Sequence, residues 1–148
     1  AERHYVLRLS SLYGGHTRKS GVDWMLRQAS DGQPVRAFAD RTVSPSYLPD
    51  VVRITGALIE RSAPYGLYHC GSTGWCTWAE LASHILDRVG RPDLLQAVPF
   101  VPSDFRAIRP RHCALANRRL EREGLPPLHW RAALDEYLWG DEPPKSRD

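Results

Sequence analysis

The sequence has no apolar run near the length of about eighteen residues that a membrane-spanning helix needs. Its first ten residues, AERHYVLRLS, lack the basic start, apolar stretch and cleavage site of a signal peptide. They also lack an initiating Met and lead almost at once into a strand-like run, so we expect a piece of a longer chain. No spacing among Cys70, Cys76 and Cys113 suggests a disulfide framework, which favours a reducing, cytoplasmic compartment.

The motifs of several chemical sites are also absent. There is no C-x-x-C or H-x-x-x-H pair, and adjacent His69 and Cys70 would point to opposite faces of a strand, so we expect no metal. A nucleophile at Cys76 is an alternative, because a helix N-terminus lowers a thiol pKa, but no sequence feature supplies its base. There is no G-x-G-x-x-G fingerprint, and neither Lys19 nor Lys145 follows a Tyr by four positions. We therefore expect no complete catalytic apparatus in this chain.

The composition is that of an ordinary globular domain, with 42% hydrophobic and 25% charged residues in a chain of 148. The net charge of +3 comes mostly from arginine and is too small to establish a polyanionic partner. Two arginine groups follow each other: Arg106, Arg109 and Arg111, then Arg118, Arg119 and Arg122. Glu121 and Glu123 interrupt the second group, so a nucleic-acid surface competes there with a solvated face. Pro110 stiffens the first group, which would present a guanidinium fork to a diphosphate.

Hydrophobic periodicity predicts strands that alternate with helices, and therefore an α/β fold. Strands are expected near residues 5–10, 34–38, 66–70 and 97–101, and helices near 22–29, 46–60, 77–90, 117–123 and 128–139. In the second helix Ser46 is the expected cap and Pro49 lies in the first turn. The buried stripe of this helix is expected to comprise Leu48, Val51, Val52, Thr55, Leu58 and Ile59.

The stretch GLYHCGSTGWCTWAEL at 66–81 predicts a strand, a tight Gly loop and a capped helix. Its Thr77 and Glu80 match the capping box, in which the Thr side chain accepts a backbone bond and Glu reaches back. Cys76 precedes the cap and is expected to pack on Leu81. The polar tail DEPPKSRD at 141–148 is expected to be disordered, which leaves one domain over 1–140.

Four motifs, in order and across nearly the whole chain, resemble the C-terminal half of the dTDP-4-dehydrorhamnose reductases, within the extended short-chain dehydrogenase/reductase superfamily. LRLSSLYGG at 7–15 is similar to the family's R-x-S-x-x-Y/F-G. ADRTVSPSYLPDVV at 39–52 is similar to its D-x-x-x-x-P-T-x-x-x-D-L-A. GLYHCGSTGWCTWAELA at 66–82 resembles its G-x-Y-H-x-x-x-x-G-x-x-S-W-x-E-F-A. AIRPRHCALANRRLEREGLPPLHWRAALDEYL at 107–138 resembles its closing A-x-R-P-x-x-S-x-L and Trp-containing last helix.

The resemblance implies the last strands of a Rossmann-type sheet plus the small substrate-binding lobe. It implies a reductase that uses NADPH or NADH to reduce the 4-keto group of a nucleotide-linked deoxysugar. The family's Rossmann glycines and catalytic Tyr-x-x-x-Lys lie upstream of Tyr5, so the isolated chain is expected to be inactive and to bind the cofactor poorly. The expected partners are a nucleotide-sugar substrate and that missing N-terminal half. A homodimer stays open, and neither a membrane nor a nucleic acid is expected.

Matching positions in the motifs give eight expected substrate-side residues: Arg8, Ser10, Ser11, Ser44, Pro45, Ser46, Arg109 and Arg111. The first three end a strand at its carboxyl edge, where α/β folds bind ligands, and would line the nicotinamide–sugar junction. Arg109 and Arg111 would hold the diphosphate or shape that loop, with a structural ion pair as the alternative for Arg109. Ser11 stands where many members carry Trp, which removes a stacking surface beside the sugar. The chain also departs from the motifs with Ser46 in place of Thr, and with Cys113 in place of Ser.

A non-catalytic alternative stays open within the same resemblance. The relatives include a regulatory subunit of methionine adenosyltransferase, which works by binding a partner enzyme. Loss of the upstream Tyr-x-x-x-Lys in the complete protein would favour that alternative.

Overall fold

The computed structural model describes residues 3–101 and 107–140, so the expected tail at 141–148 and Arg106 lie outside the described residues. The helices are α1 (Gly21–Ser30), α2 (Leu48–Glu60), α3 (Trp78–Arg88), α4 (Arg118–Arg122) and α5 (Trp130–Trp139), with a 3-10 turn, η1, at Pro92–Leu94. The strands are β1 (Tyr5–Arg8), β2 (Leu12–Tyr13), β3 (Val35–Phe38), β4 (Thr42–Val43), β5 (Ser46–Tyr47), β6 (Gly66–His69), β7 (Cys76–Thr77), β8 (Leu95–Val98) and β9 (His112–Cys113). None of these helices is long and apolar enough to cross a membrane.

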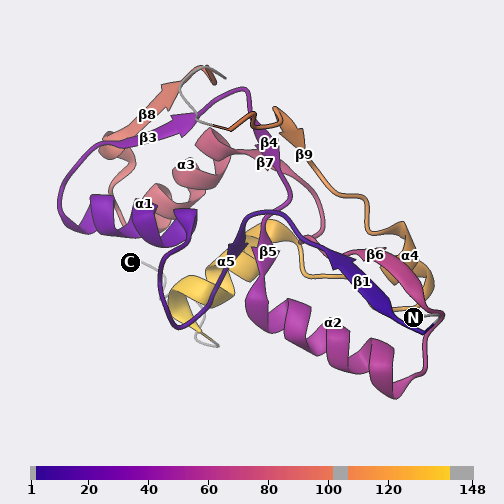
Figure 1. Cartoon of the computed structure of the whole chain (residues 1–148). Helices are drawn as coiled ribbons and strands as arrows, with labels where there is room; N and C mark the ends of the chain where they lie inside the picture. Colours follow the sequence, from indigo (N-terminus) through magenta and orange to yellow (C-terminus); the bar gives the residue numbers. More distant parts are fainter. Residues whose placement is uncertain (1–2, 102–106, 141–148) are drawn as a thin grey trace.

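The described residues form two lobes that lie side by side in Figure 1. In the first lobe β1 and β6 run parallel beside α2 and α4, around a core that includes Ile54, Leu58 and Tyr68. In the second lobe β3 and β8 run parallel and pack with α1 and α3. Short strands β4, β7 and β9 form a small mixed sheet between the lobes, and α5 adds Trp130 and Leu134 to the second core. The parallel pairs joined through helices confirm the α/β class.

The sheet of the first lobe is covered on one face only within the described residues. Tyr5, Leu7 and Tyr68 pack into the core of that lobe. On the opposite face Val6 is 48% and Leu67 is 41% exposed. Parallel sheets in α/β proteins are normally covered on both faces. An apolar, open face on a parallel pair is therefore a feature that the fold class does not explain by itself.

The capping box predicted at the start of α3 is confirmed. The Thr77 hydroxyl accepts a bond from the Glu80 N–H at 3.1 Å, and the Glu80 carboxylate accepts one from the Thr77 N–H at 2.6 Å. Cys76 and Leu81 are both fully buried in the same core, as the expected staple requires. An equivalent box with Ser20 and Asp23 begins α1, so both helices of the second lobe start at fixed points.

The expectation that Ser46 caps α2 is wrong. Tyr47 stands at the cap position and makes no side-chain capping bond, while Pro49 lies in the first turn as predicted. The Ser46 hydroxyl instead accepts a bond from the Ser10 N–H at 3.0 Å. The Ser46 hydroxyl, which could have capped α2, is thus used in a hydrogen bond with a residue 36 positions away in the sequence.

The expected buried stripe of α2 is also partly wrong. Asp50, Ile54 and Leu58 are the buried positions, spaced by four residues. Val52 is 62% and Ile59 is 60% exposed. The buried face of the helix is thus rotated relative to the expectation, and it includes Asp50, whose carboxylate accepts the Leu128 N–H.

Smaller differences concern the ends of elements. The strand expected at 97–101 is β8, which begins and ends earlier, and Val89, expected inside α3, is 39% exposed. The last helix begins at Trp130 rather than near 128, because the His129 ring accepts a bond from the Arg131 N–H at 3.3 Å and so caps it.

Candidate functional site

Two predicted serines meet where β1 leads into β2. The Ser46 hydroxyl accepts the Ser10 N–H, and the Ser11 carbonyl accepts the Ser46 N–H at 3.3 Å. β2 then pairs with β5 in parallel, Leu12 opposite Ser46. These bonds hold Ser11 in a left-handed conformation, with φ 51°, and leave its side chain exposed. Ser11 is thus displayed to solvent at a position that the neighbouring strand fixes.

Ser44 and Pro45 are fully buried and hold loops together. The Ser44 hydroxyl donates to the Gly74 carbonyl at 2.8 Å and accepts from the Leu115 N–H at 3.0 Å. The Pro45 carbonyl accepts the Ser72 N–H at 2.7 Å. The structure therefore gives these two residues contacts with the backbone of other segments.

The predicted arginines lie apart from one another. Arg8 and His69 are register partners on β1 and β6, with Arg8 Nη1 3.1 Å from His69 Nε2. Arg111 pairs with the Asp40 carboxylate. The Phe100 N–H donates to that carboxylate at 2.7 Å, and this bond together with Arg111 lowers the pKa of Asp40 below its ordinary value. Arg109 is exposed and makes no hydrogen bond or ion pair with the described residues, whereas Arg111 makes the ion pair with Asp40.

A fourth arginine, Arg41, was missed by the sequence reasoning. Its Nε donates to the Pro110 carbonyl at 3.1 Å, so the loop that carries Arg109 and Arg111 orients it. Its guanidinium carbon lies 5.3 Å from the Phe100 ring centre and 6.0 Å from that of Trp78. The Arg41 carbonyl also accepts the Trp78 N–H at 3.1 Å. Arg41 is therefore fixed between aromatic rings at the start of α3.

Arg41 borders a cavity of about 190 Å³, here called the aromatic pocket. Its lining comes from α1, β3 and the start of α3: Gly21, Trp24, Met25, Arg36, Ala37, Phe38, Arg41 and Trp78. Trp24 is 39% exposed although it belongs to a helix whose other face is core. The sequence feature that could have indicated this pocket was a Trp, Trp24, on the face of α1 opposite its apolar stripe. Aromatic walls beside arginines suit a flat ring that carries negative charge.

A second cavity of about 220 Å³, here called the slot, adjoins the aromatic pocket. It is lined by Ser11, Leu12, Tyr13, Ser20, Gly21, Val22, Trp78 and Leu81. Gly21 and Trp78 border both cavities. A Cβ on Gly21 would lie 3.0 Å from the Trp78 ring, so a side chain there would press on the wall between them. The two cavities are therefore neighbours that share a wall, and together they are here called the groove, which runs from Arg41 to Ser11.

A third cavity, of about 450 Å³, continues past the slot along the loop between β2 and α1. It shares Leu12, Tyr13 and Ser20 with the slot. Its outer wall carries the basic side chains of His16, Arg18 and Lys19. Asp23 also lines it, so this third cavity carries charged side chains of both signs.

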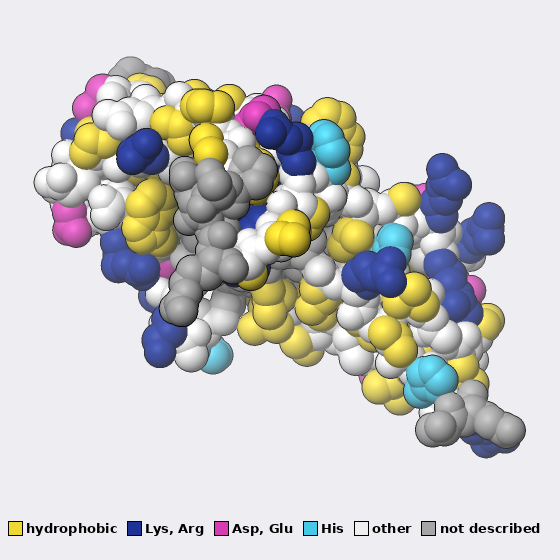
Figure 2. Space-filling model, turned by 45° about the horizontal axis from the view of Figure 1, so that its top comes forward, with side chains coloured by type: hydrophobic (Ala, Val, Ile, Leu, Met, Phe, Trp, Pro, Cys, Tyr) yellow, Lys and Arg dark blue, Asp and Glu magenta, His cyan; other side chains and the backbone are white. Residues whose placement is uncertain are grey.

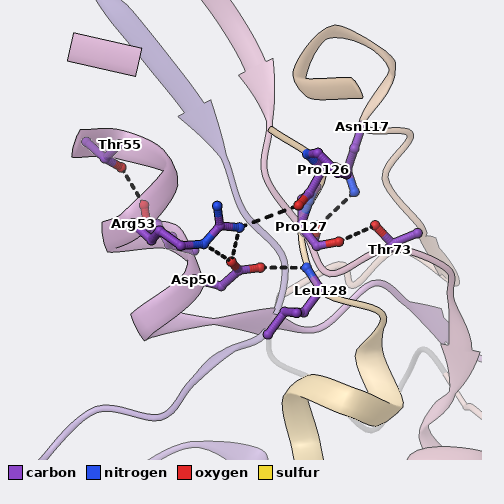
Figure 3. Close-up of polar contacts among 10 residues, drawn as sticks. Asp50, Arg53, Thr55, Thr73, Asn117, Pro126, Pro127 and Leu128 are labelled. Carbon is purple, nitrogen blue, oxygen red and sulfur yellow. Dashed lines mark hydrogen bonds and ion pairs between the residues drawn. The ribbon is translucent and has the colours of Figure 1, made fainter. Parts of the chain in front are cut away.

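Asp50, part of the motif at 39–52, anchors the segment that leads into α5 (Figure 3). One carboxylate oxygen accepts Arg53 Nε at 2.9 Å, and the other accepts the Leu128 N–H at 2.8 Å. Thr73 donates to the Pro127 carbonyl at 2.7 Å in the same place. The motif residue Asp50 thus connects α2 to the segment that leads into the last helix, α5.

Replacing Asp50 by alanine is expected to lower the free energy of unfolding by about 2–3 kcal/mol, because the Leu128 N–H loses its acceptor. Urea unfolding followed by circular dichroism measures this. Asp87→Ala, an exposed carboxylate on α3, serves as the matched control and is expected to change stability by less than about 0.5 kcal/mol. Equal effects of the two substitutions would contradict the anchoring role of Asp50.

The cysteines do not form a reactive site. Burial raises the pKa of the Cys76 thiol to about 12 and that of Cys70 to about 11. The expectation that the helix N-terminus lowers the Cys76 pKa is therefore wrong, because desolvation of the thiolate outweighs the helix dipole. The described residues contain no group of His, Cys, Asp and Glu that could hold a metal ion.

Thiol labelling at pH 8 is expected to modify Cys113 quickly and the buried Cys70 and Cys76 at least about 100-fold more slowly. The unfolded chain releases the thiol protons near pH 9, whereas the native chain keeps them to about pH 11–12. The native state thus binds more protons in this window, so stability falls as the pH rises through it. Mass spectrometry of the labelled peptides measures the rates; equal rates at all three thiols would contradict the burial.

Exposed basic side chains are spread over the molecule, and Figure 2 shows some of them in dark blue at the end that carries α4. Arg119, however, donates to the carbonyls of Pro64, Tyr65 and Leu67 and lies 4.2 Å from the Tyr68 ring centre. It therefore holds the start of β6 to α4. Only two arginines of the second group, Arg118 and Arg122, face solvent there.

Comparison with known sequences finds a family described as the RmlD substrate binding domain, which matches residues 1–142. The chain is 34% identical over 133 residues to the spore coat polysaccharide biosynthesis protein SpsK of Bacillus subtilis. It is 33% identical over 138 residues to the dTDP-4-dehydrorhamnose reductase of Streptomyces griseus. These matches cover 90% and 89% of this chain but 46% and 45% of the relatives, so the chain spans about half of their length.

Two solved structures share the fold over most of the chain. The dTDP-4-dehydrorhamnose reductase of Bacillus anthracis, solved in complex with NADP, aligns with a TM-score of 0.77 at 27% identity, over 95% of this chain and 49% of that one. The reductase of Clostridium acetobutylicum aligns with a TM-score of 0.77 at 26% identity, over 90% of this chain and 47% of that one. The motifs, the parallel strands and these matches lead to one assignment: the chain belongs to the RmlD substrate-binding domain family, that of the dTDP-4-dehydrorhamnose reductases.

Proposed function

We propose that the chain is the substrate-binding portion of an NAD(P)H-dependent reductase that acts on the 4-keto group of a nucleotide-linked deoxysugar. The observation that carries this proposal is the groove, in which the aromatic pocket at Arg41 and the slot at Ser11 lie next to each other. The end at Arg41 has aromatic rings and arginines, which suit a base and a diphosphate. The end at Ser11 presents a hydroxyl, which suits a sugar. The family assignment and the names of the relatives support the same substrate class.

The aromatic pocket fits the nucleotide end. Trp24, Trp78 and Phe38 offer ring faces and edges to a pyrimidine base. Arg36 and Arg41 border the same cavity, and paired guanidinium groups suit the diphosphate. In this proposal Arg109 and Arg111 act on the loop that orients Arg41, through the Pro110 carbonyl, rather than on the diphosphate directly.

The sugar lies toward the carboxyl edge of β1, beyond the slot. Ser11, exposed at this edge, is the predicted residue that borders the groove. Ser10, Ser44, Pro45 and Ser46 contribute by holding the strand ends and loops around it. The chain's own part in the reaction is thus to bind and orient the sugar nucleotide.

The cofactor and the catalytic acid belong, in this proposal, to an N-terminal half that precedes this chain in the complete protein. The absence of the G-x-G-x-x-G fingerprint from the sequence supports this placement of the dinucleotide site. The open face of β1 and β6, with Val6 and Leu67, is where we place that half, because a parallel sheet needs a second cover. Arg8 and His69 end the same two strands and would face the junction with it. With three free cysteines, we assign the complete protein to the cytoplasm.

The experiment is a set of titrations of the 148-residue chain with dTDP and with NADPH, together with a turnover assay. We expect saturable binding of dTDP, no comparable binding of NADPH, and no NADPH-dependent reduction of a 4-keto sugar nucleotide. Turnover by this chain alone would contradict the assignment of cofactor and catalysis to another half.

The alternatives predict different results in the same experiment. A regulatory relative would bind methionine adenosyltransferase and not dTDP. A nucleic-acid-binding domain would bind RNA or DNA with an affinity that falls steeply with salt. The bonds of Arg119 to backbone carbonyls disfavour this second alternative, because they remove one cation from the exposed arginine group.

A further inference from the structure

The open face of the sheet formed by β1 and β6 carries two rows of side chains. Val6 and Leu67 form the first row and are register partners in the parallel pair. Arg8 and His69 form the second row, two residues further along each strand. Because side chains alternate between the faces of a strand, both rows point away from the core of the first lobe. The face thus combines an exposed apolar surface with a cation at the carboxyl end of the strands.

The charge of Arg8 is not neutralised within the part of the chain that the structure describes. Arg8 Nη1 lies 3.1 Å from His69 Nε2, and since a guanidinium can only donate, the imidazole nitrogen must accept. This bond uses one of five N–H donors and supplies no negative charge. Arg8 makes no ion pair with any described residue. The side chain is exposed, so in the isolated chain solvent surrounds the remaining donors.

Any element that covers the open face removes this solvent from Arg8. An arginine is almost never fully buried unless it is paired, because an unpaired buried ion loses its hydration without compensation. A carboxylate suits a guanidinium best, since it accepts two parallel hydrogen bonds. The covering surface must therefore present apolar side chains to Val6 and Leu67 and a carboxylate to Arg8.

The covering element is expected to be a helix. Parallel strands are joined by crossover connections, usually helices, and these connections cover the faces of the sheet. On the opposite face α2 already supplies Ile54 and Leu58 to the core (Figure 1). The relatives are about twice as long as the part that this chain matches, which leaves room for such a helix in the N-terminal half.

We propose that an amphipathic helix of the N-terminal half covers the open face and pairs an Asp or Glu carboxylate with Arg8. The proposal rests on the function proposed above and names the chemistry that joins the two halves. Arg8 is then a residue of the interface between the halves and not a contact of the sugar nucleotide.

The first test measures Arg8→Ala in two contexts, the 148-residue chain and the complete protein. In the chain Arg8 is exposed, so its removal is expected to lower the melting temperature by less than about 2 °C. In the complete protein the substitution leaves a buried carboxylate without its partner, and a fall of at least about 5 °C is expected. Arg118→Ala, exposed on α4, is the matched control and is expected to shift both melting temperatures by less than about 2 °C.

A second measurement decides the question if Arg8→Ala prevents the complete protein from folding. The photo-reactive amino acid p-benzoylphenylalanine replaces Leu67 in the complete protein, and mass spectrometry identifies the peptide to which it cross-links. We expect a peptide of the N-terminal half with an Asp or Glu within about two helical turns of the attachment point. The same amino acid in place of Val52, on an exposed face of α2, should not cross-link to that peptide.

Equal shifts of the melting temperature in the two contexts would overturn the proposal. Cross-links from position 67 that are confined to this chain, or that join two copies of it, would do the same. The affinity of the 148-residue chain for dTDP is expected to change by less than about twofold in Arg8→Ala, and a loss of about tenfold or more would instead assign Arg8 to the phosphates. Failure of the unaltered chain to bind dTDP would remove the proposed substrate site and leave the two readouts of the interface unchanged.

Discussion

Replacing Arg41 by alanine is expected to weaken dTDP binding by about 10- to 100-fold. The guanidinium is held between the rings of Trp78 and Phe100 and by the Pro110 carbonyl, so little conformational freedom is lost when it meets a diphosphate. Charge-assisted bonds to a phosphate are worth more than neutral ones, which sets the size of the effect. Isothermal titration calorimetry at constant salt measures the two dissociation constants.

Arg118→Ala is the matched control for this prediction. Arg118 is exposed at the start of α4, in the first lobe, and does not line the groove. Its removal changes the net charge of the chain by the same amount and is expected to change dTDP affinity by less than about twofold. Equal weakening by both substitutions would mean that the net charge, and not the position of Arg41, carries the binding.

Replacing Trp130 by alanine is expected to lower the free energy of unfolding by about 3–5 kcal/mol. The indole is 2% exposed and belongs to the core of the second lobe, with the His84 ring centre 5.6 Å away. It also begins α5, whose N–H at Trp130 donates to the Thr73 carbonyl at 3.1 Å. Loss of the side chain therefore leaves a cavity at the point where α5 joins the loop that precedes α3.

Trp75→Ala provides the comparison, because Trp75 is 61% exposed only a few residues from the same loop. Its removal is expected to change stability by less than about 0.5 kcal/mol. Urea unfolding at 25 °C, followed by circular dichroism, measures both variants. A small effect of Trp130→Ala would contradict the assignment of α5 to the core of the second lobe.

Local chemistry was sufficient to predict some of these elements. The Thr77 and Glu80 box depends on residues three positions apart, so the start of α3 could be predicted. The class of the fold followed from alternating strand and helix patterns in the same way. The exposed Val52 and Ile59 show the limit, since apolar spacing alone cannot tell which face of a helix the core will take.

The groove could not be predicted because its contacts are distant in sequence. Ser10 and Ser46 meet across 36 positions, and Arg41 reaches Pro110 across 69. The sequence pointed to Arg109 and Arg111 because they flank Pro110, yet the arginines that border the aromatic pocket are Arg36 and Arg41. Of the predicted residues, Ser11 borders the groove. Ser44 and Ser46 are buried, and their hydroxyls form hydrogen bonds with the backbone of other segments.

The most direct test of the central claim is a titration of ¹⁵N-labelled chain with dTDP, followed through the indole N–H signals of its five tryptophans. Trp24 and Trp78 line the aromatic pocket, whereas Trp75, Trp130 and Trp139 do not. We expect saturable shifts of the first two signals and no comparable shifts of the other three. Shifts confined to Trp75, Trp130 or Trp139, or the absence of any shift at millimolar dTDP, would contradict a nucleotide-sugar site in this groove.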